Sequence, residues 1–454
     1  MSDGYDVDLV VIGAGTGGQS VARACASEGW SVVIVDELPY GGTCALRGCD
    51  PKKMLVGVTE AADWARRMDG RGLRVERLGF DWSDLMAFKR SFTDRMPDRI
   101  EGGLEKHGVE TLHGTAAFVG PNQIRIDDRI INTRHVHIAT GARPRTLGIR
   151  GEELVSTSTD FLELERLPER ITFIGGGFIS FEFAHIAKRA GAASVTIVHR
   201  GERPLEGFDP DLVAMQTART RELGVEVVLD AEATAVERND EGLVLRFDSA
   251  SGSASVASDL VVHGAGRVPN IDGLELKAGG VAFGPRGVAV NRSMRSVSNP
   301  SVFAAGDAAD TGAPALTPVS ANEARVAFKN LLAGEDERTI EYPPIPSVVF
   351  TVPPLARVGM LETEAEEAGL DVEVHHRETG DWYSSLRVAE THTAYKTIVE
   401  KGTKRIVGAH VMGPGAEEQI NLLAMAVGAG MTANDLKGVV FAYPSFASDL
   451  ASMV

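Results

Sequence analysis

The sequence predicts an α/β fold built on two copies of one unit, in which a strand, a glycine-rich turn, a helix and a second strand follow one another. Three observations carry this prediction. The unit occurs near the N-terminus, the same layout returns in the middle of the chain, and the segment from residue 341 onward reads as mixed strands and helices. With 454 residues the chain is too long for one ordinary domain, so we expect two to four.

The composition disfavours several classes of protein and partner. Apolar residues make up 43% and charged residues 24%, which describes a globular protein with an ample core. A net charge of −17 disfavours nucleic acids and anionic membrane surfaces as partners. The first residues, MSDGYDVDLVVIG, have neither a basic start nor a long apolar run. We therefore expect no signal peptide, no membrane span and no nucleic-acid partner.

The chain is poor in cysteine. Its three cysteines argue against a secreted disulfide scaffold and for a reducing compartment such as the cytoplasm. Cys25 lies in SVARACASEGW among alanine and valine at helical spacing, so we interpret it as a buried core residue. Cys44 and Cys49 form a close pair, and in such a compartment a close pair is more often catalytic or metal-binding than a structural staple.

The first copy of the repeated unit is DLVVIGAGTGGQSVARACASEGWSVVIVDE. Gly13, Gly15 and Gly18 supply the pattern G-x-G-x-x-G, and Asp36 ends the second strand. These glycines let the backbone approach a pyrophosphate, the helix N-terminus faces its charge, and the acid can bind a ribose hydroxyl. The unit therefore predicts a Rossmann-like dinucleotide site.

The second copy is ITFIGGGFISFEFAHIAKRAGAASVTIVHRGERPL. Gly175 lies 162 residues after Gly13, Gly177 matches the second glycine, and the small residue Ser180 takes the third position. Two such folds imply two dinucleotides. With a thiol pair just after the first fold, FAD and a nicotinamide nucleotide are the expected combination.

The second strand of this copy ends in His199 and Arg200, where an acid would bind the ribose 2′-hydroxyl. Arg200 and Arg203 are then candidates to hold a 2′-phosphate, which favours NADPH over NADH. The alternative is that both arginines only occupy a solvent-exposed loop.

The stretch GGTCALRGCDPKK holds the thiol pair. A zinc site usually needs four ligands, and with one cysteine pair and no His-x-x-x-His we expect no metal site. In a regular helix, Cα atoms five residues apart are separated by roughly 8–9 Å, whereas a disulfide needs less than about 7 Å. The segment must therefore be distorted, and Gly48 can take the required dihedrals. A strained, accessible disulfide is readily reduced, and a helix N-terminus and nearby lysines stabilise the thiolate that it releases.

With these motifs in this order, the sequence resembles the class I pyridine nucleotide-disulfide oxidoreductases, the flavoproteins of the glutathione reductase and dihydrolipoamide dehydrogenase type. The resemblance runs from about Tyr5 to the C-terminus and includes ATGARP, GRVPN, FAAGDAAD and LTPVSANEAR. It implies a discontinuous FAD-binding domain (1–147 and 268–340), an NAD(P)H-binding domain (148–267) and a C-terminal α/β dimerisation domain (341–454). A homodimer is expected.

The resemblance also implies roles for individual residues. Cys49 would be the thiolate that contacts the flavin, and Cys44 the thiol that attacks the substrate. Lys52 or Lys53 would lie near the flavin and pair with Glu182, and the sequence leaves both lysines open. The residues implied in binding FAD are Gly13, Gly15, Gly18, Asp36, Gly42, Thr43, Thr140, Gly141 and Asp307. Those implied at the nicotinamide nucleotide and at the return from its domain are Gly175, Gly177, Arg200, Arg203 and Gly266.

One segment departs from the family pattern. Disulfide reductases of this family carry a catalytic histidine in a His-Pro-Thr segment, oriented by a glutamate five residues later. Here FAYPSFASDL places Tyr443 at the histidine position and Ser448 at the glutamate position, with Asp449 one further. A phenol, with a pKa near 10, is mainly a proton donor, so Tyr443 can protonate a leaving thiolate but does not readily deprotonate Cys44.

The leading hypothesis is therefore an FAD-dependent enzyme that passes electrons from NADPH, through the flavin and a Cys44–Cys49 disulfide, to a small disulfide-type substrate. The alternatives are an NAD(P)H-dependent reductase of quinones, oxygen or another non-disulfide acceptor, and a dihydrolipoamide dehydrogenase-like enzyme. A flavoprotein whose oxidation state is sensed by a partner is a third class.

Overall fold

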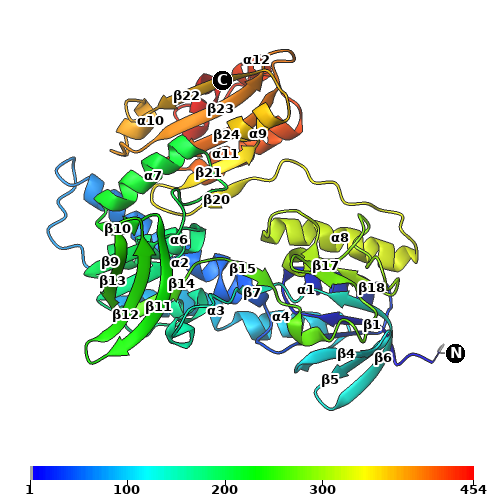
Figure 1. Ribbon diagram of the computed structural model, residues 1–454. Coiled ribbons are helices and arrows are strands. Elements are labelled where there is room, and N and C mark those ends of the chain that lie inside the picture. Colours follow the sequence, from blue (N-terminus) through cyan, green and yellow to red (C-terminus); the bar gives the residue numbers. More distant parts are fainter. Residues whose placement is uncertain (1–3) are drawn as a thin grey trace. The chain divides into compact units, whose positions relative to one another are not determined.

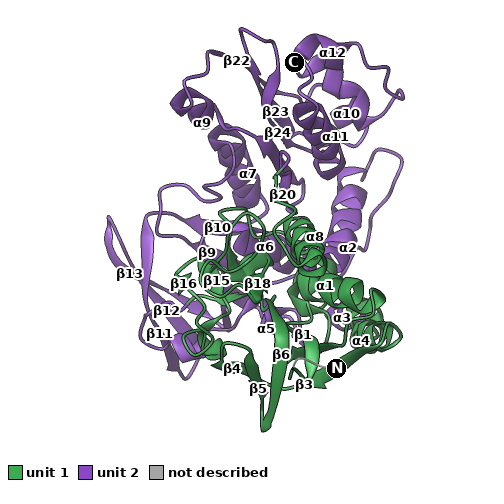
Figure 2. Ribbon diagram, turned by 90° about the vertical axis from the view of Figure 1, so that its right-hand side faces the viewer, with its two compact units in different colours: residues 1–51, 88–145, 267–342 green, residues 52–87, 146–266, 343–454 purple. Residues whose placement is uncertain are grey.

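The computed structural model describes residues 4–454 and divides into two compact units (Figure 2). The first unit comprises residues up to 51, 88–145 and 267–342. The second comprises residues 52–87, 146–266 and 343–454. Two helices, α2 (Cys49–Arg67) and α3 (Trp82–Thr93), each contain a point at which the chain passes from one unit to the other.

A mostly parallel sheet forms the centre of the first unit. β1 (Val7–Ile12) lies in its middle, parallel to β2 (Val32–Asp36) on one side and to β6 (Arg129–Ile138) on the other. The sequence of β1 is almost wholly apolar because a parallel strand in the middle of a sheet is buried on both faces. The other strands are β3 (Val109–His113) beside β2, antiparallel β5 (Gln123–Ile126) and β4 (Ala116–Gly120) beyond β6, and β18 (Val302–Ala304), which pairs with β6.

Two helices pack together against this sheet. α1 (Thr16–Ser27) and α8 (Thr317–Ala333) are in contact, and their apolar residues share a core with those of β1. Cys25 is fully buried in this core, as the sequence predicts, and burial raises the pKa of its thiol to about 12. The remaining elements of the unit are α4 (Met96–Glu105), β7 (Ala142–Pro144), β15 (Arg267–Pro269), β16 (Phe283–Gly284), β17 (Gly287–Ala289) and β19 (Ala309–Asp310).

The second unit contains a parallel sheet in which β8 (Arg170–Ile174) lies between β9 (Ser194–Val198) and β14 (Leu260–His263). β9 and β14 are labelled in Figure 1. The sheet ends at β10 (Val225–Val228), beside β9. Its other elements are the helices α5 (Ser158–Phe161), α6 (Phe178–Ala190) and α7 (Pro210–Glu222) and an antiparallel sheet of β11 (Ala231–Asn239), β12 (Gly242–Ser249) and β13 (Gly252–Ser258).

The C-terminal part of this unit is an antiparallel sheet with helices. α11 (Ala416–Gly428) packs on two of its strands, β21 (Leu355–Gly359) and β24 (Ile406–Met412). The remaining elements are β20 (Ser347–Val349), β22 (Val372–Glu378), β23 (Ala394–Glu400), α9 (Glu362–Glu367), α10 (Tyr383–Leu386) and α12 (Ala433–Lys437). Within residues 4–454 we find no helix with the length and apolar character needed to cross a membrane.

The predicted repeat is present, with the same backbone at both glycine turns. Gly13 follows β1 with a φ of 103°, and Gly175 follows β8 with a φ of 104°. These values lie where side chains are disfavoured. Space is limiting as well, since a Cβ atom on Gly175 would lie 2.6 Å from the Cα of Ala265, and one on Gly13 would overlap the carbonyl oxygen of Ala139.

A buried ion-pair cluster joins three helices of the second unit. Asp63 of α2 contacts Arg67 of the same helix, Arg189 of α6 and Arg219 of α7, at 2.9, 3.0 and 3.5 Å. The side chain of Arg189 is fully buried. Burial raises the pKa of Asp63, but the three arginines lower it by more than burial raises it. The pKa of Asp63 is therefore below its usual value. Asp63 is therefore held as a carboxylate.

Candidate active site

The first glycine turn is tied to Asp36, the acid at the end of β2. Oδ2 of Asp36 accepts a hydrogen bond from the backbone N–H of Ala14 at 2.7 Å. Gly42 approaches the same turn so closely that a Cβ atom on it would lie 2.6 Å from the Cα of Gly15. Three parts of the chain named in the sequence prediction therefore meet at one place in the first unit.

Thr140 and Asp307 are further predicted cofactor residues of this unit. The hydroxyl oxygen of Thr140 is buried and has no hydrogen-bond partner among the described residues. Burial raises the pKa of Asp307, Arg267 lowers it, and Glu323 raises it again. An unpartnered hydroxyl, a half-buried acid and a glycine turn that admits no side chain fit a polar nucleotide ligand such as FAD.

Glu323 was not singled out from the sequence, yet it organises the turn that carries Asp307. It is 1% exposed, and its carboxylate accepts three hydrogen bonds. One comes from the N–H of Gly306 at 2.6 Å, one from Thr311 at 2.9 Å and one from Tyr342 at 2.6 Å. Burial and this contact raise the pKa of Tyr342, so its phenol stays protonated and donates. A glutamate on the apolar face of a helix is the sequence signal that could have revealed it.

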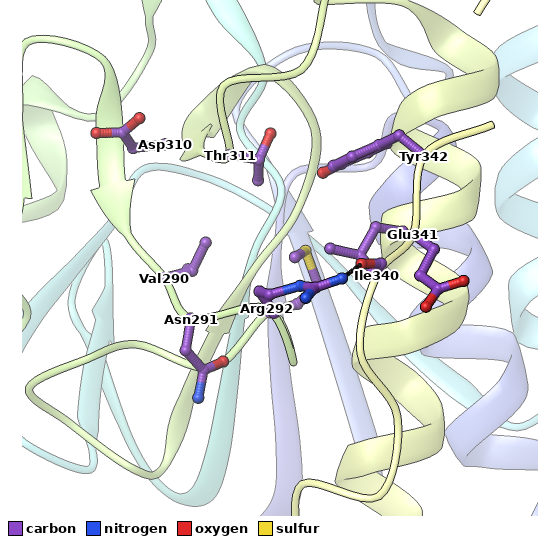
Figure 3. A pocket seen from close by; sticks show the side chains of 9 residues that line it. Val290, Asn291, Arg292, Asp310, Thr311, Ile340, Glu341 and Tyr342 are labelled. Carbon is purple, nitrogen blue, oxygen red and sulfur yellow. Dashed lines mark hydrogen bonds between the residues drawn. The ribbon is translucent and has the colours of Figure 1, made fainter. Parts of the chain in front are cut away.

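Thr311 and Tyr342 also line a pocket of about 570 Å³ in the first unit (Figure 3). One wall includes Arg292, which donates a hydrogen bond to the carbonyl oxygen of Ile340 at 3.1 Å. Acidic and basic side chains both face the pocket, and none of the predicted site residues lines it. The pocket thus borders the two hydroxyl-bearing residues that donate hydrogen bonds to Glu323.

The thiol pair lies in an interrupted helix. Thr43–Arg47 forms one π-helical turn that contains Cys44, and α2 begins afresh at Cys49. Gly48 separates the two, and a Cβ atom there would lie 2.9 Å from the carbonyl oxygen of Thr43. The predicted departure from a regular helix is therefore confirmed.

No disulfide joins Cys44 to Cys49, which corresponds to the reduced form of the predicted pair. A hydrogen bond with Cys49 and burial raise the pKa of Cys44, whereas a contact with Thr317 lowers it. The hydroxyl of Thr317 lies 3.8 Å from the sulfur of Cys49. Cys44 thus keeps its proton in the reduced pair. Thr317 begins α8 within the quoted segment LTPVSANEAR, but its contact with the thiols was not foreseen.

In the second unit, Lys52 and not Lys53 is the partner of Glu182. The Nζ atom of Lys52 lies 2.9 Å from Oε1 of Glu182, and both side chains are buried. The same carboxylate oxygen accepts the N–H of Phe350 at 2.8 Å. Lys53 instead pairs with Glu417 at 3.4 Å, and its side chain is 40% exposed. The choice between lysines that the sequence left open is decided by this geometry.

The second glycine turn is bordered by the loop after β9. Gly177 caps α6, and Ser180 lies so close to Gly264 that a Cβ atom there would overlap its hydroxyl oxygen. Arg200 is exposed, Arg203 is half-buried, and the chain returns from this sheet through Gly266, whose φ is 108°. The predicted residues thus lie around one turn, with both arginines on its loop.

Tyr443 does not receive the orienting contact that the family pattern would place at Ser448. Ser448 donates to the carbonyl oxygen of Ser445 at 2.6 Å, and Asp449 accepts a hydrogen bond from Ser384. Tyr443 is 80% exposed in the single chain. Among residues 4–454 no group of three or more histidine, cysteine or acidic side chains could hold a metal ion.

Comparison with known proteins places this geometry in a family. Residues 7–324 match the model of the pyridine nucleotide-disulphide oxidoreductases, and residues 345–454 match the dimerisation domain of the same family. The chain is 32% identical over 449 residues to a glutathione reductase of Burkholderia cepacia, covering 99% of this chain and 98% of that protein. It is 31% identical over 446 residues to a dihydrolipoyl dehydrogenase of Bacillus subtilis (strain 168), covering 97% and 94%.

A solved structure agrees with the relatives. The HOCl-induced flavoprotein disulfide reductase RclA from Escherichia coli matches with a TM-score of 0.87 and 26% identity, over 98% of this chain and 99% of that one. The predicted fold class and family are thereby confirmed. The chain belongs to the pyridine nucleotide-disulphide oxidoreductases and is a flavin-dependent disulfide oxidoreductase that uses FAD and a pyridine nucleotide.

Proposed function

We propose that this protein is a homodimeric, NADPH-dependent reductase of a small disulfide, and that Cys44 and Cys49 are its redox-active pair. The observation that carries the proposal is the thiol pair itself, with Cys44 hydrogen-bonded to Cys49 in an interrupted helix. Bound FAD would accept hydride from the nicotinamide nucleotide and deliver two electrons to the cysteine pair. Asp36, Thr140 and Asp307 would hold it.

The thiol chemistry uses the chain's own residues and protons exchanged with water. Cys44 loses its proton to water as its sulfur attacks one sulfur of the substrate disulfide and forms a mixed disulfide, and the departing thiolate takes a proton from Tyr443, which water then reprotonates. The Cys49 thiolate attacks the sulfur of Cys44, which re-forms the Cys44–Cys49 disulfide and releases a second thiolate, and this thiolate takes the next proton from Tyr443. Two electrons and two protons convert one disulfide into two thiols.

The nucleotide preference and the assembly complete the proposal. Arg200 and Arg203, with His199 in place of an acid, support NADPH, although the relatives include dihydrolipoyl dehydrogenases. Exposed apolar side chains on the C-terminal part support a dimer formed there, among them Met425 and Val440, which are 72% and 97% exposed. We propose FAD-binding residues 1–147 and 268–340, an NAD(P)H-binding domain at 148–267 and a dimerisation domain at 341–454.

A second candidate is the reduction of quinones, oxygen or another non-disulfide acceptor. The observation that favours it is the missing acid–base pair, since Ser448 and Asp449 contact other residues and neither orients Tyr443. Such acceptors need no thiol to attack them. Turnover that survives Cys44→Ser would support this candidate, whereas its loss would support the first.

The deciding experiment is anaerobic reduction of the purified protein with NADPH or NADH, followed by rapid mixing with acceptors. We expect NADPH to reduce the flavin faster than NADH does. The reduced protein should show long-wavelength charge-transfer absorbance from the Cys49 thiolate, and a small disulfide should reoxidise it quickly. Reoxidation only by quinones or oxygen would contradict the disulfide substrate. Absence of charge-transfer absorbance in the reduced protein would contradict the role of Cys49.

A further inference from the structure

Each of the two glycine turns of this chain makes an equivalent hydrogen bond from its middle residue, and only the acceptor differs between them. In the first unit, the N–H of Ala14 donates to the carboxylate of Asp36 at 2.7 Å. In the second unit, the N–H of Gly176 donates to Nδ1 of His199 at 3.0 Å. Ala14 and Gly176 are the middle residues of matching turns. An imidazole thus takes the place of a carboxylate at the second turn.

This contact fixes the proton of His199. Because Nδ1 accepts a hydrogen bond it carries no hydrogen, so the proton of the neutral ring lies on Nε2. Nε2 lies 3.1 Å from the carbonyl oxygen of Arg203, to which it donates. Both ring nitrogens are therefore used, and only the neutral ring can make both contacts. An imidazolium would point a second N–H at the N–H of Gly176.

His199 holds the turn and the arginine loop together. A Cβ atom on Gly176 would lie 2.6 Å from Cγ of His199, so the imidazole fills the space that a side chain would occupy. The carbonyl oxygen of Gly176 accepts the N–H of Leu205 at 2.8 Å, which fastens the far end of the loop. The side chain of His199 is only 12% exposed. A change in its contacts therefore reaches both the glycine turn and Arg203.

Charged residues of the same loop surround the ring. Oε1 of Glu206 lies 3.8 Å from Nε2, and Arg200 and Arg203 belong to the same loop. Asp230, on the connection after β10, donates its backbone N–H to Gly201 of this loop. The first turn of α6, on the other side, carries no acidic residue.

We propose that His199 is a nucleotide-positioning residue, and that its neutral imidazole holds the second glycine turn and the Arg203 loop in the form that binds NADPH. Affinity for the nucleotide then falls as His199 takes up a proton. The inference rests on the proposed function, which assigns a nicotinamide nucleotide with a 2′-phosphate to this turn. An imidazolium that merely attracted the phosphate would give the opposite sign, with tighter binding at lower pH.

The test is calorimetric titration of the FAD-loaded protein with NADP⁺, which binds without reducing the flavin, between pH 5.5 and pH 8.5. The matched variant is His199→Asn, because its amide oxygen can accept from Gly176 as Nδ1 does and does not titrate. The 2′-phosphate itself takes up a proton near pH 6, and this affects both proteins equally. Far-UV circular dichroism and flavin absorbance across the range verify that both stay folded and loaded.

We expect the wild-type affinity to fall about tenfold more than that of His199→Asn between the two ends of the range, since one buried hydrogen-bond acceptor is lost. Superimposable pH profiles, or wild-type affinity that rises relative to the variant as pH falls, would overturn the inference. No binding of NADP⁺ or NAD⁺ to the wild type at pH 8.5 would instead remove the proposed nucleotide site, and this inference with it.

Discussion

Lys52 and Glu182 form a buried ion pair, with 2.9 Å between Nζ and Oε1 and side chains that are 9% and 2% exposed. The ammonium also lies 4.4 Å from the centre of the Phe350 ring, and the carboxylate accepts the N–H of Phe350. One residue further along α2, Lys53 reaches the same ring but pairs with the half-buried Glu417. Adjacent lysines thus have different environments.

We expect Lys52→Met to lower the free energy of unfolding by roughly 3–5 kcal/mol, because it leaves the charge of Glu182 buried without a partner. Lys53→Met is the matched control and should cost less than about 1 kcal/mol, since its ion pair is partly exposed. Urea unfolding followed by circular dichroism measures both. Equal losses for the two variants would contradict this assignment.

The Asp63 cluster predicts a pH dependence of stability. The pKa of Asp63 is lower in the folded protein than its usual value near 3.8, so its contribution is present above pH 4 and is lost as the pH falls further. Asp63→Asn removes the carboxylate that the buried Arg189 contacts directly and should cost about 3–5 kcal/mol at pH 7. The difference between wild type and variant should shrink below pH 4 in urea titrations. A constant difference down to pH 2.5 would refute the electrostatic origin.

Glu323 should matter for retention of FAD. Glu323→Leu removes the acceptor for Gly306 and for two hydroxyls, so we expect FAD affinity to fall at least tenfold. Glu323→Gln should lose less, because its amide oxygen can still accept from Gly306 while the hydroxyls turn to accept from its NH₂ group. Fluorescence titration of the apoprotein with FAD measures both, and wild-type affinity in the leucine variant would exclude the role.

Tyr443 should act only in the half of the reaction that consumes the disulfide. We expect Tyr443→Phe to lower disulfide turnover about a hundredfold while flavin reduction by NADPH stays unchanged in rapid mixing. Tyr443→His, which supplies an imidazole, should exceed the phenylalanine variant. Thermal unfolding of the purified variants, compared with that of the wild type, checks that a loss of turnover does not come from lost stability. Unchanged disulfide turnover in Tyr443→Phe would favour the non-disulfide acceptors.

Much of the fold could be predicted from the sequence, because the sequence patterns that specify it lie within short segments of the chain. The glycine turns need residues that tolerate positive φ, and Gly13 and Gly175 occur where the apolar strands end. The interrupted helix around Cys44 and Cys49 followed from the spacing of the two thiols alone. The burial of Cys25 in the core was predicted from the helical spacing of the apolar residues around it.

The features of the site that the sequence did not predict depend on contacts between segments far apart in the chain. Glu182 meets Phe350, 168 residues later in the chain, and no local pattern announces that contact. Lys52 and Lys53 point in directions about 100° apart on one helix, and only the packing of the helix decides which of them reaches the carboxylate. His199 departs from the expected acid, yet its hydrogen bond to Gly176 depends on a ring orientation that the sequence does not encode.

The short span between the thiols also has a kinetic consequence. Cys49 begins a helix directly after the π-helical turn that carries Cys44, so the second thiol is already beside the first when a mixed disulfide forms. Such tethering corresponds to an effective concentration on the order of millimolar or higher. Free thiols in solution must compete with that concentration to intercept the intermediate. Ring closure therefore keeps the cycle moving forward even where product thiol accumulates.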